Sequence, residues 1–184
     1  MRLIGLAGPK RAGKDTVATM IQDVWSDWQR VAFAQPIKDM LRVGLDLTDR
    51  QLEGDLKEVM DFRYGKSPRE MMETLGTEWG RDCVTRDLWF RIARNKTAQY
   101  EGPTIITDVR FGNEAEWVRS EGVLIHLLGR GEADQSHESR LGVEIMQGDL
   151  LLHNYGTVEE LRVKLHKLLH NYSFGTSGGQ TSFI

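Results

Sequence analysis

Short apolar runs alternate with longer stretches of helical periodicity along this chain of 184 residues. Continuous apolar runs of a few residues are typical of strands that are buried on both faces of a parallel sheet. Such runs occupy residues 3–7, 31–34, 104–108, 123–128 and 149–154. Strands that alternate with helices predict an α/β fold with a mainly parallel, five-stranded sheet flanked by helices.

Helix starts are marked by caps and by the spacing of apolar side chains. A proline at a first turn favours a helix from Pro36, and a Thr-x-x-Gln pair predicts another start at Thr48. Ser67, with a proline after it and an acid three residues on, predicts a third start. Thr157 with Glu160 predicts the last. The stripe expected to bury the final helix is Val158, Leu161, Leu165 and Leu168.

The spacing of these elements predicts one domain over residues 1–172. Residues 35–83 are helical and charged and separate two predicted strands, so we interpret them as an insertion that covers a substrate. Residues 129–147 are polar and lack periodicity, which favours a short lid. Residues 173–184 are rich in Gly, Ser and Thr and are expected to form a flexible tail.

The composition and net charge indicate which kinds of binding partner can be expected. Hydrophobic residues make up 40% of the chain, charged residues 28%, and the net charge is −3. A protein built to hold nucleic acid is usually basic, so neither nucleic acid nor a membrane is expected as a partner. No apolar run approaches the roughly 20 residues that span a bilayer. Cys83 is the only cysteine, which favours a reducing compartment, and we expect a cytoplasmic protein.

The clearest motif is "GPKRAGKDT", which follows the first predicted strand. It matches G-x-x-x-x-G-K, in which glycines let backbone amides face phosphate oxygens and the next helix presents its N-terminus to the anion. The alternative is a glycine-rich turn that only connects a strand to a helix. The residues expected at ATP phosphates are Gly8, Arg11, Ala12, Gly13, Lys14, Asp15 and Thr16.

Two acids are candidates for a metal ion. Asp15 replaces the usual Ser or Thr after the motif lysine and is a hard oxygen ligand suited to Mg²⁺. Asp108 ends a predicted strand, where ligands of parallel sheets collect. The alternatives are that Asp15 caps the helix and that Asp108 makes a local contact with Arg110 or the backbone.

Several arginines lie outside the core pattern. Arg69 and Arg81 flank the helix that starts at Ser67, and Arg130 and Arg140 bracket the predicted lid. Guanidinium groups bind phosphates in a bidentate manner and offset charge in phosphoryl transfer. Arg110 could pair with a phosphate in the same way. Among the histidines only His137, in the lid, is a candidate for function.

Taken in order, several segments resemble the phage deoxynucleoside monophosphate kinases of the T-even type, a branch of the P-loop nucleoside monophosphate kinase superfamily. The segments, which cover most of the chain, are "GPKRAGKDT", "QPIKDML" at Gln35, "SPREMMETLGTEWGRD" at Ser67, "ITDVRFGNE" at Ile106, "SHES" at Ser136 and "GDLLLHNYGTVEEL" at Gly148. The chain carries Arg140 where the family pattern is expected to have an acid.

The resemblance implies a P-loop fold and Mg²⁺-dependent transfer of the ATP γ-phosphate to a deoxynucleoside monophosphate (dNMP), by a homodimer. The catalytic residues that it implies are Lys14, Arg130 and Asp108. Asn154 and Gly156 are expected near the adenine, and Arg130, His137 and Arg140 in the lid. Residues expected at the dNMP are Lys38, Arg69, Glu73, Gly76, Thr77, Arg81, Trp89 and Arg110.

Three other functions remain open. A switch-type GTPase needs Asn-Lys-x-Asp after a strand, and "NKTA" at Asn95 lacks the aspartate. A kinase of another small acceptor, such as dephospho-coenzyme A, shares the expected fold. A non-catalytic nucleotide-binding module is disfavoured by the acidic composition.

Overall fold

The computed structural model describes residues 2–129 and 142–175, with side chains described up to residue 172. The chain forms two compact units. The α/β unit comprises Met1–Val31 and Gln99–Ile184, and the helical unit comprises Ala32–Ala98. The helical unit extends beyond the predicted insertion at 35–83 because it includes a further helix.

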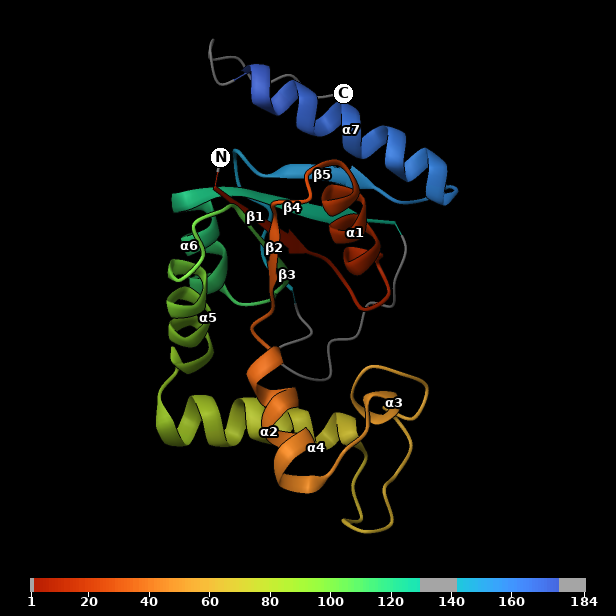
Figure 1. Ribbon diagram of the computed structural model, residues 1–184, viewed down its shortest axis with the longest axis vertical. Helices are drawn as coiled ribbons and strands as arrows, with labels where there is room; N and C mark the ends of the chain where they lie inside the picture. The colour runs from red at the N-terminus through yellow and green to blue at the C-terminus, as the bar shows by residue number, and fades with distance from the viewer. Residues whose placement is uncertain (1, 130–141, 176–184) are drawn as a thin grey trace. The chain divides into compact units, whose positions relative to one another are not determined.

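Five parallel strands form the sheet of the α/β unit, as predicted (Figure 1). They are β1 (Leu3–Ala7), β2 (Gln29–Val31), β3 (Thr104–Val109), β4 (Gly122–Leu128) and β5 (Leu150–His153). Their order is β2-β3-β1-β4-β5, and all four neighbouring pairs run parallel. The first strand is therefore central, and all five of its residues are buried.

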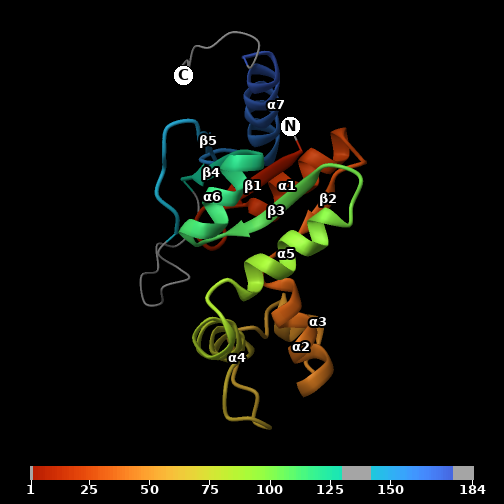
Figure 2. The same cartoon turned by 90° about the vertical axis from the view of Figure 1, so that its left-hand side faces the viewer.

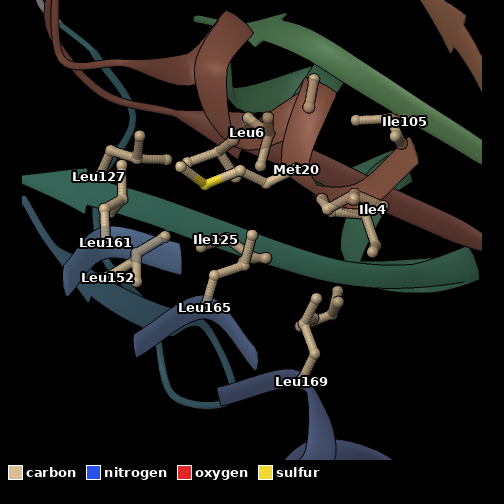
Figure 3. Packing of buried hydrophobic residues seen from close by; sticks show 14 of the residues in the cluster. Ile4, Leu6, Met20, Ile105, Ile125, Leu127, Leu152, Leu161, Leu165 and Leu169 are labelled. Carbon is tan, nitrogen blue, oxygen red and sulfur yellow. The ribbon is translucent and has the colours of Figure 1, made fainter. Parts of the chain in front are cut away.

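Three described helices cover this sheet. They are α1 (Lys14–Val24), α6 (Gly112–Glu121) and α7 (Val158–Gly175). Side chains of α1 and α7 share one cluster with the strands, in which Met20, Leu161 and Leu165 meet (Figure 3). The opposite face carries α6, which lies in front of the strands in Figure 2. There a Cβ added to Gly5 would lie 2.7 Å from Val118, so the central strand needs glycine where α6 crosses it.

Two predictions in the α/β unit were wrong in detail. The second strand was placed at 31–34, but it ends at Val31, and Gln35 donates to the carbonyl of Ala32 in a turn. Phe33 is buried without being part of a strand, and a short apolar run does not distinguish these cases. On α7, Val158 is 56% exposed, and Leu169 completes the buried stripe instead. This helix continues through Gly175, so residues 173–175 are helical where a flexible tail was predicted, and the rest of that tail lies outside the described residues.

The helical unit contains five helical segments. They are α2 (Gln35–Leu45), α3 (Asp49–Leu52), α4 (Pro68–Thr74), η1 (Leu75–Val84) and α5 (Leu88–Ala98). Both predicted capping boxes form: the side chain of Gln51 accepts from the backbone N–H of Thr48, and that of Glu70 accepts from the N–H of Ser67. Each box fixes the first turn of its helix.

The most unusual element is η1, a π-helix of ten residues that continues α4. Long π-helices are rare and often occur at functional sites. Two buried glycines lie where neighbouring side chains come close. A Cβ on Gly76 would lie 3.0 Å from Ile37, and one on Gly80 would lie 2.5 Å from the ring of Trp89. The sequence predicted only an ordinary helix after the start at Ser67. In this π-helix Trp79 is 42% exposed.

Candidate functional site

The phosphate loop, residues 8–13, joins β1 to α1 at the carboxyl end of the central strand. Gly8 has φ +143° and Gly13 has φ +98°, both in a region that L side chains rarely adopt. A side chain at Gly8 would also meet the carbonyl oxygen of Leu127 at 2.7 Å. The loop therefore requires glycine at the two positions that the motif specifies.

Lys14 begins α1 and folds back over the loop. Its Nζ donates to the carbonyl oxygens of Gly8 and Pro9, both at 2.7 Å. Burial of the ammonium lowers the pKa of Lys14 to about 8; the charge of Arg110 acts in the same direction. Asp15 and Asp108 oppose this shift. An ammonium held this way is ready to exchange two neutral acceptors for phosphate oxygens.

The structure brings four predicted site residues to one end of the sheet. Lys14 and Asp15 come from α1, and Asp108 and Arg110 come from the end of β3. The last three are close enough to Lys14 to change its pKa. Asp15 lies in the first turn of α1 and is exposed, as is Thr16, whereas the N-cap is Gly13. The alternative role of Asp15 as the capping residue was therefore wrong.

Glu114 supports this corner and was not singled out from the sequence. It is 1% exposed, and its carboxylate accepts from the backbone amides of Arg110 (2.9 Å) and Phe111 (3.1 Å). These bonds fix the chain between Asp108 and α6. The signal was present in "RFGNE", because an acid three residues after a helix start often caps it.

The donors at this corner fit Mg²⁺. Among the described residues, no three or more His, Cys, Asp or Glu side chains gather so that they could hold a metal alone. Mg²⁺ in phosphoryl-transfer sites usually keeps several waters and takes one or two carboxylates beside substrate phosphates. Asp15 and Asp108, both near Lys14, supply that number and kind of ligand.

The turn after β5 contacts the phosphate loop. The side-chain amide of Asn154 donates to the carbonyl of Ala12 at 2.9 Å, and Asn154 is 6% exposed. Gly156 packs against the Glu160 side chain, so a larger residue there would displace the capping acid. The predicted contact of this turn with adenine stays a prediction.

In the helical unit the predicted dNMP contacts are already paired. Arg69 donates to Glu73 at 2.6 Å, with side chains 11% and 18% exposed. Lys38, on α2, pairs with Glu53 at 2.6 Å. Partly buried ion pairs of this kind fix the position of the positively charged group. A phosphate that binds this group must compete with the carboxylate for its hydrogen bonds.

The π-helix carries Gly76, Thr77 and Arg81. Arg81 donates to the carbonyl of Arg86 at 3.1 Å, and Thr77 is partly exposed. Trp89 is 2% exposed, and its indole N–H donates to the carbonyl of Gly76 at 2.7 Å. The structure therefore gives Trp89 a supporting position inside the helical unit, which disagrees with a direct contact to the nucleotide.

Arg130, His137 and Arg140, predicted in the lid, lie outside the described residues. The chain that follows them is anchored by a cluster that the sequence did not reveal. Asp149 accepts two bonds from Arg119, at 2.9 and 2.7 Å, and one from the backbone of Met146. It also lies 2.8 Å from Nε2 of His126, whose pKa burial lowers.

Comparison with known proteins shows to which family the chain belongs. The sequence matches the family described as "DNMK: Deoxynucleotide monophosphate kinase" over residues 2–65 and 56–165. The chain belongs to the deoxynucleotide monophosphate kinase family. This confirms the resemblance found in the sequence.

Two relatives named as such kinases align with more than nine tenths of the chain. A protein of Acanthamoeba polyphaga mimivirus named "Putative deoxynucleotide monophosphate kinase" is 31% identical, over 94% of this chain and 98% of its own. The deoxynucleotide monophosphate kinase of Enterobacteria phage T4 is 24% identical, over 92% of this chain and 99% of its own.

The fold of this family member is also that of a solved kinase. Shikimate kinase from Aquifex aeolicus superposes with a TM-score of 0.57, over 94% of this chain and 99% of that one, at 14% identity. At that identity the likeness concerns the fold alone, and it confirms the predicted α/β fold with a parallel five-stranded sheet flanked by helices. None of the described helices is long and apolar enough to cross a membrane.

Proposed function

We propose that this protein transfers the γ-phosphate of ATP to a deoxynucleoside 5′-monophosphate in a reaction that requires Mg²⁺. The observation that carries the proposal is the position of Lys14. Its ammonium donates to two carbonyl oxygens of the phosphate loop, at the N-terminus of α1 and near two carboxylates. The chain that carries this lysine belongs to the deoxynucleotide monophosphate kinase family.

In this proposal the α/β unit binds the donor. Backbone amides of the phosphate loop and of the N-terminus of α1 would donate hydrogen bonds to the β- and γ-phosphates, and Lys14 would exchange its carbonyl partners for phosphate oxygens. Asp15 and Asp108 would hold Mg²⁺. The ion would supply charge neutralisation on the phosphates. Arg110, near Lys14, adds a permanent positive charge at the same corner.

The helical unit would bind the acceptor. Arg69 and Arg81 are the guanidinium groups that we assign to the dNMP, with Lys38, Glu73 and Thr77 beside them. The acceptor phosphate is anionic, so no protein nucleophile is required. Its oxygen forms the new bond to the γ-phosphorus while the bond from that phosphorus to the bridging oxygen breaks and ADP leaves.

We also propose a homodimer that acts in the cytoplasm and, given relatives encoded by phages, supplies precursors for phage DNA synthesis. Light scattering after size-exclusion chromatography tests the dimer, and a mass of 21.0 kDa would contradict it.

The deciding experiment is a coupled assay of ADP release with each acceptor in turn. The panel comprises dAMP, dGMP, dCMP, dTMP, dUMP, their ribose counterparts and dephospho-coenzyme A. We expect at least one dNMP to be converted to the diphosphate, identified by chromatography. Phosphorylation of dephospho-coenzyme A alone would favour the other kinase, and ATP binding without any phosphorylated acceptor would favour a non-catalytic module.

A further inference from the structure

A side chain that is distant in the sequence forms a hydrogen bond with the backbone of the phosphate loop. The side-chain Nδ2 of Asn154 donates to the carbonyl oxygen of Ala12 at 2.9 Å, across a sequence separation of 142 residues. The bond is buried, since Asn154 is 6% exposed and Ala12 is 1% exposed. Water therefore does not compete for it.

Asn154 is itself fixed to the sheet. It directly follows β5, and its backbone N–H donates to the carbonyl of Leu128 at the end of β4, at 2.7 Å. In the last pair of that ladder Leu128 lies opposite His153. The amide that reaches Ala12 thus extends from the rigid end of two paired strands.

The loop is shaped to receive this side chain. Gly13 has φ +98°, and a Cβ built on it would lie 2.9 Å from Nδ2 of Asn154. Glycine is needed here both for the backbone conformation and for the close approach of the amide. In addition, the N–H of Ala12 donates to the carbonyl of Pro9 at 3.2 Å, so the peptide before the contact is held as well.

Peptide geometry turns this contact into a constraint on the loop amides. In a planar trans peptide, the carbonyl and the following N–H point in opposite directions. Holding the carbonyl of Ala12 against Asn154 therefore aims the N–H of Gly13 away from Asn154. Gly13 is the N-cap of α1, at the helix end where donors need an acceptor such as phosphate.

We propose that Asn154 is a positioning residue that presets the phosphate loop, and that it acts on the polyphosphate part of the donor whatever base the donor carries. This rests on the proposed function only in that the loop binds a donor triphosphate. It differs from the role expected from the sequence, in which Asn154 lies at the adenine. A contact with the base discriminates among donors, whereas a preset loop serves all of them equally.

The test measures binding of two probes in the presence of Mg²⁺: ATP, and inorganic tripolyphosphate, which has no base. Isothermal titration is done on the full chain and on Asn154→Ala and Asn154→Asp. We expect both variants to weaken both probes by the same factor, about tenfold, because a lost hydrogen bond leaves a buried carbonyl unpaired. The KM of the dNMP should stay within twofold.

Gln22→Ala is the matched control. Like Asn154, Gln22 carries an amide that donates to a backbone carbonyl of the α/β unit, that of Trp28 at 2.8 Å, but this bond is partly buried and does not involve the loop. Its loss should lower the melting temperature and leave both affinities unchanged. Hydrogen exchange adds a local readout, and residues 8–14 should exchange faster in Asn154→Ala but not in Gln22→Ala.

Two results would overturn the inference. If ATP binding weakens while tripolyphosphate binding does not, Asn154 contacts the base. If neither weakens in Asn154→Asp, which keeps the size of the side chain, the contact has no role in binding. Failure of the proposed function is distinct, because it would be detected in the acceptor assay on the unaltered protein, whereas binding of the two probes tests only the phosphate loop.

Discussion

The phosphate loop of the α/β unit and the Arg69 region of the helical unit are built in different ways. The loop presents backbone amides, and its lysine rests on two neutral carbonyls. In the helical unit the candidate contacts are side chains already bound to carboxylates, Arg69 to Glu73 and Lys38 to Glu53. In the proposed reaction, a triphosphate would therefore replace neutral partners of Lys14, whereas a monophosphate would have to displace or share an acid.

This difference suits the ligands of the proposed reaction. Each turnover would use the same triphosphate, for which a fixed set of backbone amides suffices, because no pairing partner can neutralise an amide. Acceptors that differ in base or sugar would be bound by paired side chains, which can be altered one at a time. The comparison leads to five predictions, from the largest effect to the smallest.

Replacing Lys14 tests the α/β unit most severely. We expect Lys14→Ala to lower kcat/KM by at least about 10³-fold, since the charge that faces the transferred phosphate is lost. The KM of the dNMP should change little, because the helical unit is untouched. Steady-state kinetics with both substrates varied measures this, and normal turnover would remove the loop from catalysis.

Replacing Asp15 and Asp108 tests whether these two carboxylates bind Mg²⁺. We expect Asp108→Asn and Asp15→Asn each to raise the Mg²⁺ concentration needed for half-maximal rate and to lower kcat by about 10²-fold, because a carboxylate ligand is lost. Titration with Mg²⁺ at saturating substrates measures both values. If activity and Mg²⁺ dependence stay unchanged in both variants, the metal assignment is wrong.

In the helical unit, Arg69→Ala and Arg81→Ala should act on the acceptor. Hydrogen bonds to charged groups contribute about 1.5–3 kcal/mol, which corresponds to a roughly 10–100-fold increase in the KM of the dNMP. The KM of ATP should remain the same. Arg91→Ala, an exposed arginine of α5, serves as the control. An unchanged dNMP KM in both variants would place the acceptor elsewhere.

The pH dependence of ATP binding should follow Lys14. Its pKa in the free protein is about 8, so the binding-competent ammonium is present below that pH and is lost as the pH rises through it. We expect the Kd of ATP to increase by up to about tenfold per pH unit above 8. In Lys14→Arg, whose guanidinium stays charged, this rise should be absent. A rise that persists there would assign the titration to another group.

The smallest effect concerns the π-helix. Trp89→Phe removes the indole donor and leaves the carbonyl of Gly76 without it, which should lower the free energy of unfolding by about 1–3 kcal/mol. The KM of the dNMP should rise a few-fold, and that of ATP should not. Trp79→Phe is the control, because Trp79 is 42% exposed and phenylalanine keeps an aromatic ring at its contact with Trp89. Equal effects of the two variants would argue against a special role for Trp89.

What the sequence predicted correctly depends on local patterns. The run "LIGLA", the glycines of the loop and the caps at Ser67 and Thr157 act over a few residues, and the corresponding strand, loop and helices all form. The gathering of Lys14 with Asp108 also followed from a simple rule, because the carboxyl ends of parallel strands share one edge of the sheet.

What the sequence did not reveal depends on packing between distant segments. The π-helix has an ordinary helical pattern in the sequence, and no local signal indicated that Ile37 and Trp89 would pack against its glycines. The contact of Asn154 with Ala12 and the cluster around Asp149 join residues that are far apart in the chain. No spacing rule connects such pairs.

The place where the helical unit leaves the sheet has an evolutionary consequence. β2 and β3 are paired in parallel, with Val31 opposite Ile106, although all of Ala32–Ala98 separates them along the chain. Only two peptide connections, at 31–32 and 98–99, therefore join the units covalently. A chimera that exchanges Ala32–Ala98 between family members changes nearly every residue that we assign to the acceptor. The phosphate loop, Lys14, Asp15 and Asp108 stay in their native chain. Recombination at these two junctions gives a route by which such kinases could diversify their substrates without rebuilding the donor site.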